Sequence, residues 1–159
     1  MKIQEVMTKE VRFCGPSTNL AEAAGMMWAD GCGTLPVVDE NHNVLGMITD
    51  RDICIALGTR DAKAVALQVK DVSLPKLFSC EPEDDIHKAL DTMATQKVRR
   101  LPVIDAKGTL RGILSIDDVV LRAEKHPETA TGLSYADVVI ALQGICEPAE
   151  ERLPLAVQV

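Results

Sequence analysis

An internal repeat is the feature that most constrains how this chain can fold. A shift of 66 positions aligns residues 3–53 with residues 69–119 without a gap, and eleven of the 51 aligned pairs are identical. Unrelated segments of ordinary composition would match at about three positions. A unit of about 50 to 60 residues is too small to bury a good core alone. We therefore expect two copies of one unit, copy one and copy two, that share a core.

Both copies predict the same order of elements, β-α-β-β-α, which defines an α+β fold. Short strands at "VRFC" and "LFSC" are each followed by a proline that breaks the chain. Asn19 and Asp85 then suit the N-caps of helices with apolar residues at helical spacing. The strands "TLPVVD" and "RLPVID" lead through the turns "NHN" and "AKG" to the strands "VLGMIT" and "LRGILS". Helices at "DRDICIAL" and "IDDVVLRA" complete the copies.

The repeat divides the chain into copy one at 1–60, copy two at 61–125 and a C-terminal extension at 126–159. In the extension, "SYAD" predicts a capping box and Gly144 predicts a helix end. The run 138–142 is apolar nearly all round, which predicts a buried helix, packed on its own domain, across a dimer or onto a partner. The tail "EPAEERLPLAVQV" suits a flexible terminus or a docking segment.

Composition and charge exclude several classes of function. The net charge of −7 provides no basic surface for nucleic acid or an anionic membrane. No membrane span or signal peptide is recognisable, so we expect a soluble cytoplasmic protein. The five cysteines include no C-x-x-C pair, and the three histidines lie far apart, which argues against a metal site or a disulfide framework. No nucleophile elbow, P-loop or other catalytic set occurs, so the sequence does not predict an enzyme.

The equivalent sequences "GMITDRD" and "GILSIDD" have two physical explanations. A hydroxyl at Thr49 or Ser115, where a strand meets a helix, suits an N-cap, and Asp52 or Asp118 completes a capping box. The same groups suit a nucleotide, because a helix start binds phosphate and a carboxylate binds both ribose hydroxyls. Capping alone does not require the glycine, which lets backbone or ligand approach closely. Capping also does not require the run Leu-Pro-Val-hydrophobic-Asp that both copies have about ten residues upstream. The glycine and this run therefore favour ligand binding over capping alone.

The chain resembles a tandem pair of cystathionine β-synthase (CBS) domains, often called a Bateman module. The resemblance covers residues 1 to about 124 and rests on "EVMT", "NLAEAA", "LPVVDENHNVLGMITDRDI" and "RLPVIDAKGTLRGILSIDDV". It implies pseudo-twofold pairing of the copies with two clefts between them. Such clefts often bind AMP, ADP, ATP, NAD or S-adenosylmethionine. Family members commonly form homodimers through their helices and regulate an attached or associated enzyme, transporter or channel.

The resemblance also implies roles for individual residues. Thr49 and Ser115 would contact phosphate, and Asp52 and Asp118 would hold ribose. Arg51 would reach phosphates, whereas Asp117 at the equivalent place in copy two disfavours a long phosphate tail, so the two clefts should differ. The basic cluster before the second Leu-Pro strand suits a solvated turn or, through bidentate guanidinium groups, a phosphate contact; it contains Lys97, Arg99 and Arg100.

In the family, the first strand and the segment before Leu-Pro frame the adenine, largely through their backbones. The corresponding segments are Arg12–Cys14 with Thr34–Pro36, and Phe78–Cys80 with Arg100–Pro102. The ligand-binding candidates in these segments are Cys14, Thr34, Leu35, Pro36, Cys80, Leu101 and Pro102.

These observations predict a stand-alone regulatory sensor that binds an adenine nucleotide or adenosyl ligand and transmits ligand state to a partner protein. The mechanism would be a differential affinity for two arrangements of the module or dimer. The alternative is a structural or oligomerisation module whose clefts are empty, in which case capping explains the repeated motif. An enzyme is a third hypothesis, which turnover of a bound nucleotide would reveal.

Overall fold

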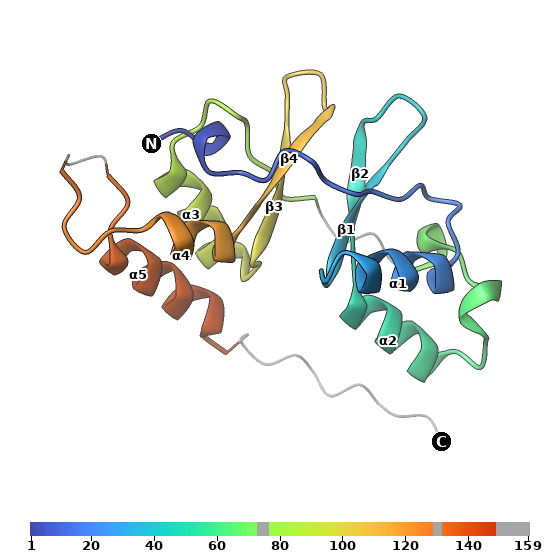
Figure 1. Ribbon diagram of the computed structural model, residues 1–159. Coiled ribbons are helices and arrows are strands. Elements are labelled where there is room, and N and C mark those ends of the chain that lie inside the picture. Colours follow the sequence, from blue (N-terminus) through green and yellow to red (C-terminus); the bar gives the residue numbers. More distant parts are fainter. Residues whose placement is uncertain (73–76, 129–131, 149–159) are drawn as a thin grey trace.

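The two copies form two similar halves that lie side by side in the computed structural model (Figure 1). The structure describes residues 1–72, 77–128 and 132–148. Copy one contains α1 (Leu20–Ala29), β1 (Thr34–Val38), β2 (Val44–Thr49) and α2 (Asp50–Thr59). Copy two contains α3 (Ile86–Gln96), β3 (Arg100–Ile104), β4 (Leu110–Ser115) and α4 (Ile116–Arg122). The helices lie on one side of two antiparallel hairpins, so the predicted α+β class is confirmed.

Hydrogen bonds between the two hairpins show the pseudo-twofold relation directly. The Val44 N–H donates to the Gly108 carbonyl over 3.0 Å, and the Leu110 N–H donates to the His42 carbonyl over 3.1 Å. The 66-residue shift converts one of these bonds into the other. His42 and Gly108 occupy the same turn position, and both have positive φ, 62° and 85°. The predicted turns "NHN" and "AKG" are therefore confirmed, and they join the copies.

The strands predicted at "VRFC" and "LFSC" are wrong in extent, because each shrinks to a single parallel β-bridge. The Cys14 N–H donates to the Pro36 carbonyl and the Val38 N–H donates to the Cys14 carbonyl, over 3.0 and 2.9 Å. Lengthening this ladder would need an N–H from Pro36 at one end or from Pro16 at the other. Proline has none, so both directions are blocked. Copy two repeats the pattern with Cys80, Pro82 and Pro102.

The segments that open the two copies are exchanged between the halves. The first includes η1 (Ile3–Glu5), where the Ile3 N–H donates to the Asp84 carbonyl of copy two over 3.0 Å. The second includes η2 (Ala64–Ala66) and η3 (Val69–Asp71), where the Val69 N–H donates to the Thr18 carbonyl of copy one over 2.9 Å. Figure 1 shows the N-terminal segment crossing in front of both hairpins. Each half therefore depends on the other to complete its structure.

Two apolar cores reflect this exchange. The core of copy two contains Ile3 and Val6 from the opening segment of copy one, while the core of copy one contains Val69 and Val72. Because those side chains leave water only when both halves are present, we expect the copies to unfold together.

The C-terminal extension contributes α5 (Tyr135–Cys146), which packs against α3. The predicted capping box is confirmed, since Ser134 accepts from the Asp137 N–H over 3.2 Å and the Ser134 N–H donates to Asp137 Oδ2 over 2.8 Å. The helix end predicted at Gly144 is wrong, because α5 continues to Cys146. A Cβ at Gly144 would lie 2.8 Å from Cβ of Ala94, so the glycine is needed where the two helices touch.

Within the single chain, α5 is buried on one face only. Val138, Ala141 and Ile145 are buried, but Val139 and Ile140 are 53% and 65% exposed. The helix lies on the outside of the molecule, so its own domain covers one stripe of it, and packing of the other face across a dimer or onto a partner stays a prediction. No helix in the described ranges has the length and apolar character needed to cross a membrane. The tail from residue 149 onward lies outside the described residues.

Candidate ligand-binding cleft

Both repeated motifs form complete capping boxes at a junction between strand and helix. In copy one, Thr49 Oγ1 accepts from the Asp52 N–H over 3.1 Å, and the Thr49 N–H donates to Asp52 Oδ2 over 3.0 Å. In copy two, Ser115 Oγ accepts from the Asp118 N–H over 3.1 Å, and the Ser115 N–H donates to Asp118 Oδ2 over 2.8 Å. Each box fixes its aspartate through Oδ2, so the carboxylate has a defined position.

The opening segment of copy one passes directly over the motif of copy two. Thr8 and Ile113 exchange two backbone hydrogen bonds, of 3.0 and 2.9 Å, and the Thr8 hydroxyl donates to Asp118 Oδ1 over 3.3 Å. A Cβ at Gly112 would lie only 2.6 Å from the Thr8 carbonyl oxygen. The glycine of "GILSIDD" is therefore required by close approach of the backbone.

A cleft of about 660 Å³ opens beside this crossing, within the size range of small-molecule sites. Its walls come from both copies, because the exchanged opening segment and the start of β1 face the motif of copy two. The lining residues are Thr8, Glu10, Val11, Arg12, Asp30, Cys32, Thr34, Arg100, Ile113, Ser115 and Asp118.

Four of the predicted binding residues meet in this cleft: Thr34, Arg100, Ser115 and Asp118. Thr34 and Ser115 are nearly buried, and Thr34 Oγ1 donates to the Ile48 carbonyl over 2.9 Å. Arg100 pairs with Ser115 across the β3–β4 ladder, which places a guanidinium next to the capping box. The cleft thus combines a fixed carboxylate, hydroxyl groups and cations, which are groups that bind a polar ligand.

Both arginines of the cleft already face a carboxylate. Arg12 Nε lies 2.7 Å from Asp30 Oδ2. A terminal nitrogen of Arg100 lies 3.5 Å from Asp117 Oδ2, on the first turn of α4. A ligand anion would have to compete with these carboxylates for either guanidinium.

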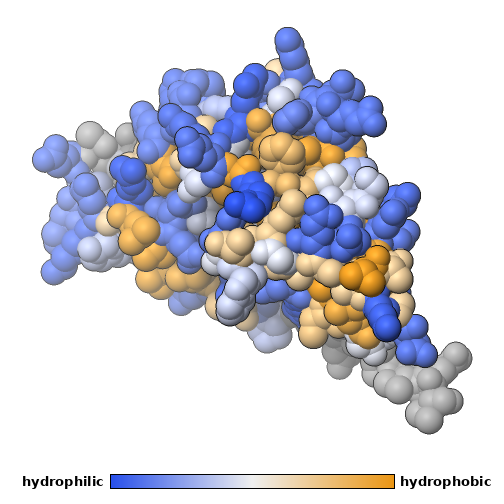
Figure 2. Space-filling view, turned by 45° about the vertical axis from the view of Figure 1, so that its right-hand side comes forward, coloured by the Kyte–Doolittle hydropathy of each residue, from blue (hydrophilic) through white to orange (hydrophobic). Residues whose placement is uncertain are grey.

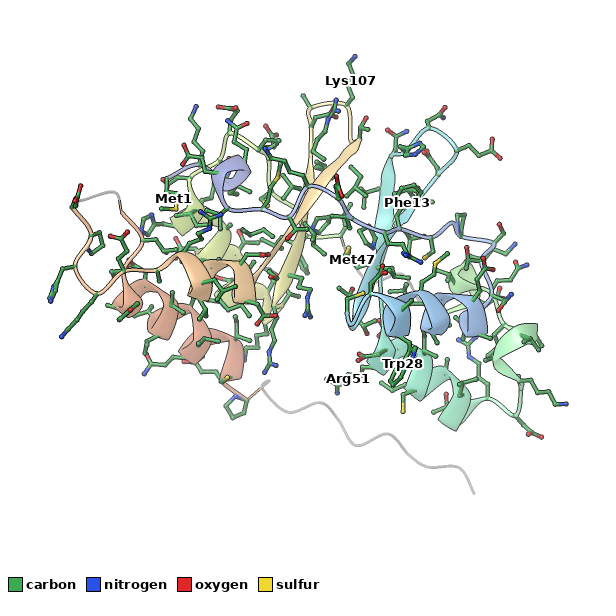
Figure 3. The ribbon with its side chains drawn as sticks, in the orientation of Figure 1. Met1, Phe13, Trp28, Met47, Arg51 and Lys107 are labelled. Atoms are coloured by element: carbon green, nitrogen blue, oxygen red, sulfur yellow. The ribbon has the colours of Figure 1, made fainter. Side chains whose placement is uncertain are left out.

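The motif of copy one lies outside this cleft. Thr49 and Asp52 are half-buried at the start of α2, and Arg51 beside them is exposed (Figure 3). The positions equivalent to Thr8 and Glu10 fall among residues 73–76, which lie outside the described residues.

The remaining candidates face the cores or the solvent. The side chains of Cys14, Leu35, Cys80 and Leu101 are buried in the two cores. Burial raises the pKa of the Cys14 thiol to about 11 and that of Cys80 to about 12, because the thiolate would lose its hydration. The carbonyls of Pro36 and Pro102 accept the cysteine N–H groups. Arg99 is exposed outside the cleft, and its carbonyl accepts from the Ile116 N–H over 2.9 Å.

Sequence reasoning missed several lining residues, most clearly Thr8, Glu10 and Asp30. Thr8 and Glu10 reach the motif only because the opening segment crosses to the other copy, and a repeat shift alone does not reveal that exchange. Within the described ranges, His, Cys, Asp and Glu side chains form no group of three that could hold a metal ion.

Two pseudo-symmetric units, each with a β-hairpin between two helices, and a polar cleft whose walls come from both define a tandem-repeat module. The family model of the CBS domain matches residues 3–59 and again residues 69–125. The chain belongs to the CBS domain family and carries two tandem CBS repeats.

The chain is similar in sequence to a known protein and similar in fold to solved structures. The uncharacterized protein YlbB of Bacillus subtilis is 32% identical over 134 residues, which span 84% of this chain and 89% of the relative. The crystal structure of CBSX2 in complex with AMP matches with a TM-score of 0.67 at 28% identity, over 76% of this chain and 93% of that one. The CBS domain pair of protein MJ0100, in complex with 5′-methylthioadenosine and S-adenosyl-L-methionine, matches with a TM-score of 0.69 at 19% identity, over 76% and 94%.

Proposed function

We propose that this protein is a regulatory sensor that binds an adenine nucleotide or another adenosyl ligand in the cleft beside Asp118. The observation that carries the proposal is the cleft itself, about 660 Å³ in volume, with Ser115, Asp118 and Arg100 on its wall. AMP in the complex of the similar protein CBSX2 supports this class of ligand. ADP, ATP, NAD and S-adenosylmethionine belong to the same proposal.

The capping box prepares Asp118 for this role. Its Oδ2 is held by the Ser115 N–H, whereas its Oδ1 accepts only the longer 3.3 Å bond from Thr8 among the described residues. A carboxylate oxygen held in this way can accept bonds from ribose hydroxyls without first losing rotamer freedom. Arg100 would bind a phosphate or stack on the base after leaving Asp117.

Thermal unfolding in the presence of candidate ligands tests the proposal. AMP, ADP, ATP, NAD, S-adenosylmethionine and 5′-methylthioadenosine are added separately, and a true ligand raises the unfolding midpoint as its concentration rises. If all of them leave the midpoint unmoved, the sensor hypothesis is rejected in favour of a structural module with empty clefts.

A matched pair of variants separates ligand binding from helix capping. Asp118→Ala removes a box aspartate in the cleft, and Asp137→Ala removes the same kind of aspartate from α5, outside it. Both should lose about 0.5–1.5 kcal/mol of stability, the net contribution of a hydrogen bond. Only Asp118→Ala should lose the ligand-induced shift; equal shifts in both variants would mean that Asp118 acts as a cap alone.

The proposal includes a homodimer that uses the helical face of copy one. Trp28 on α1 is 89% exposed (Figure 3), and Ile55 and Leu57 on α2 are also exposed. The position equivalent to Trp28 in copy two is Ala94, against which α5 packs at Gly144. The position of Trp28 is therefore covered in copy two and open in copy one, whereas Leu121, the equivalent of Ile55, is exposed in copy two as well. Figure 2, which turns the half with copy one forward, shows apolar surface on it.

Light scattering coupled to gel filtration tests the dimer. Trp28→Glu should produce a monomer, because a charge cannot be buried unpaired in an interface. Leu121→Glu is the control, since Leu121 is 83% exposed on α4 of copy two. A monomeric wild type, or a dimer that only Leu121→Glu disrupts, would refute this arrangement.

Transmission to a partner protein is the last part of the proposal. A ligand that contacts both Arg12 of copy one and Arg100 of copy two would favour one arrangement of the halves, and a partner that prefers that arrangement would respond. Affinity capture with and without the ligand found above tests it; a set of bound proteins that does not change with ligand would contradict it.

A further inference from the structure

The charge of the cleft beside Asp118 is unusual for a phosphate site. Its ionisable lining consists of three carboxylates, Glu10, Asp30 and Asp118, and two guanidinium groups, Arg12 and Arg100. The lining therefore has one more negative than positive charge.

Neither guanidinium is free to meet a phosphate without cost. Arg12 is paired with Asp30 at 2.7 Å, and Arg100 lies 3.5 Å from Asp117. Asp30 is at the C-terminal end of α1 and Asp117 is in the first turn of α4, so each arginine is flanked by an acid of its own copy. A phosphate that displaced either acid from its arginine would lie close to the displaced carboxylate and would be repelled by it.

The motif of copy one provides an internal comparison. The 66-residue shift places Gln96 at the position of Asp30 and Arg51 at the position of Asp117. At these two positions the repeat therefore has a neutral and a basic residue in place of the acids. The acids are a property of the cleft in copy two, not of the repeat.

We infer that the cleft beside Asp118 selects adenosyl ligands without phosphate, such as S-adenosylmethionine and 5′-methylthioadenosine, and discriminates against ADP and ATP. The inference rests on the proposed function and specifies its ligand. The ribose and base contacts are common to all these compounds, so charge decides among them. The cationic sulfonium of S-adenosylmethionine is attracted by the acids, the thioether is neutral, and a polyphosphate is repelled.

Calorimetric titration of the full chain carrying Asp52→Ala isolates this cleft from the motif of copy one. S-adenosylmethionine and 5′-methylthioadenosine should bind about tenfold more tightly than ATP, because two exposed ion pairs that each contribute up to about fivefold contribute at most about 25-fold together. AMP should lie between them. Added salt should reduce the difference between S-adenosylmethionine and ATP, since it screens exposed charges.

A double variant tests the cause. Asp30→Asn with Asp117→Asn releases both arginines and should raise ATP affinity about tenfold while leaving 5′-methylthioadenosine within about twofold. Asp61→Asn is the control, because it changes the net charge of the protein at an exposed residue outside the cleft; it should leave every affinity unchanged.

The outcomes separate this inference from the proposed function. If ATP binds as tightly as the two sulfur compounds, and Asp118→Ala abolishes its binding, the ligand selectivity is refuted and the sensor stands. The selectivity is also refuted if the double variant leaves ATP affinity unchanged. If no adenosyl ligand binds the wild type or Asp52→Ala, the proposed function and the selectivity fail together.

Discussion

Gly112→Ala is the substitution that most directly tests the exchange of opening segments. The new Cβ would lie 2.6 Å from the Thr8 carbonyl oxygen and 2.9 Å from Met7 Sδ, whereas ordinary contacts begin at 3.4 Å. The carbonyl would have to retreat by about 0.8 Å, which strains both backbone hydrogen bonds between Thr8 and Ile113. Each bond contributes about 0.5–1.5 kcal/mol net. Alanine returns about 0.5–1 kcal/mol of backbone entropy, so a net loss of about 1–2 kcal/mol is expected.

Calorimetric or fluorescence-monitored unfolding measures this loss as a decrease in Tm of about 3–6 °C for a chain of this length. Gly58→Ala is the control, because Gly58 lies within α2 and nothing approaches its Cβ position within 4 Å. It should gain about 0.5–1 kcal/mol from helix propensity. Opposite signs at the two glycines are the expected result. A Gly112→Ala protein as stable as the wild type would refute the close crossing, and with it the origin of the cleft wall.

Three further predictions concern other parts of the molecule. Gly144→Leu should push α5 away from α3 and lower Tm by several degrees, whereas an unchanged Tm would show that the helices do not touch there. The hydrogen bonds from Ser134 are the main reason that the pKa of Asp137 is lower than its ordinary value of 3.8. The contribution of ionised Asp137 to the free energy of unfolding is therefore complete above pH 3.8 and is lost as the pH falls through the lowered pKa. Asp137→Asn should therefore cost about 0.5 kcal/mol at pH 7 and progressively less as the pH falls below 3.8; a constant difference would contradict this. Exposed Cys54 should react with a thiol reagent at pH 8 far faster than Cys14 and Cys80, whose raised pKa values and burial suppress the thiolate; equal rates would show that these cores open readily.

Local chemistry made the elements predictable from sequence. Thr49 and Ser115 cap α2 and α4 because a hydroxyl and an aspartate three residues later satisfy each other's backbone N–H groups, whatever surrounds them. The hairpin turns follow from their residues in the same way. The strand predicted at "VRFC" is limited to one bridge by Pro16 and Pro36, and both prolines can be read from the sequence.

Features that depend on contacts between distant segments were not predictable in this way. Gly144 lies inside α5, where its missing side chain leaves room for Ala94, whereas sequence spacing alone assigned that glycine to a helix end. Burial at the equivalent positions Ala24 of α1 and Leu90 of α3 was likewise not predictable from the repeat. Leu90 is buried in the core that includes α5, and Ala24 is exposed.

The sequence by itself determined the duplication, the α+β class, the caps and turns, and the family resemblance, because each is encoded in neighbouring residues or in the 66-residue shift. Tertiary structure alone decided that the opening segments change places, that Gly112 accommodates the Thr8 backbone, and that Glu10 and Asp30 join Asp118 in one acidic cleft. The physical reason is that a repeated sequence specifies two equal units but does not specify which unit each segment packs on. That choice depends on which apolar side chains the two halves can bury together.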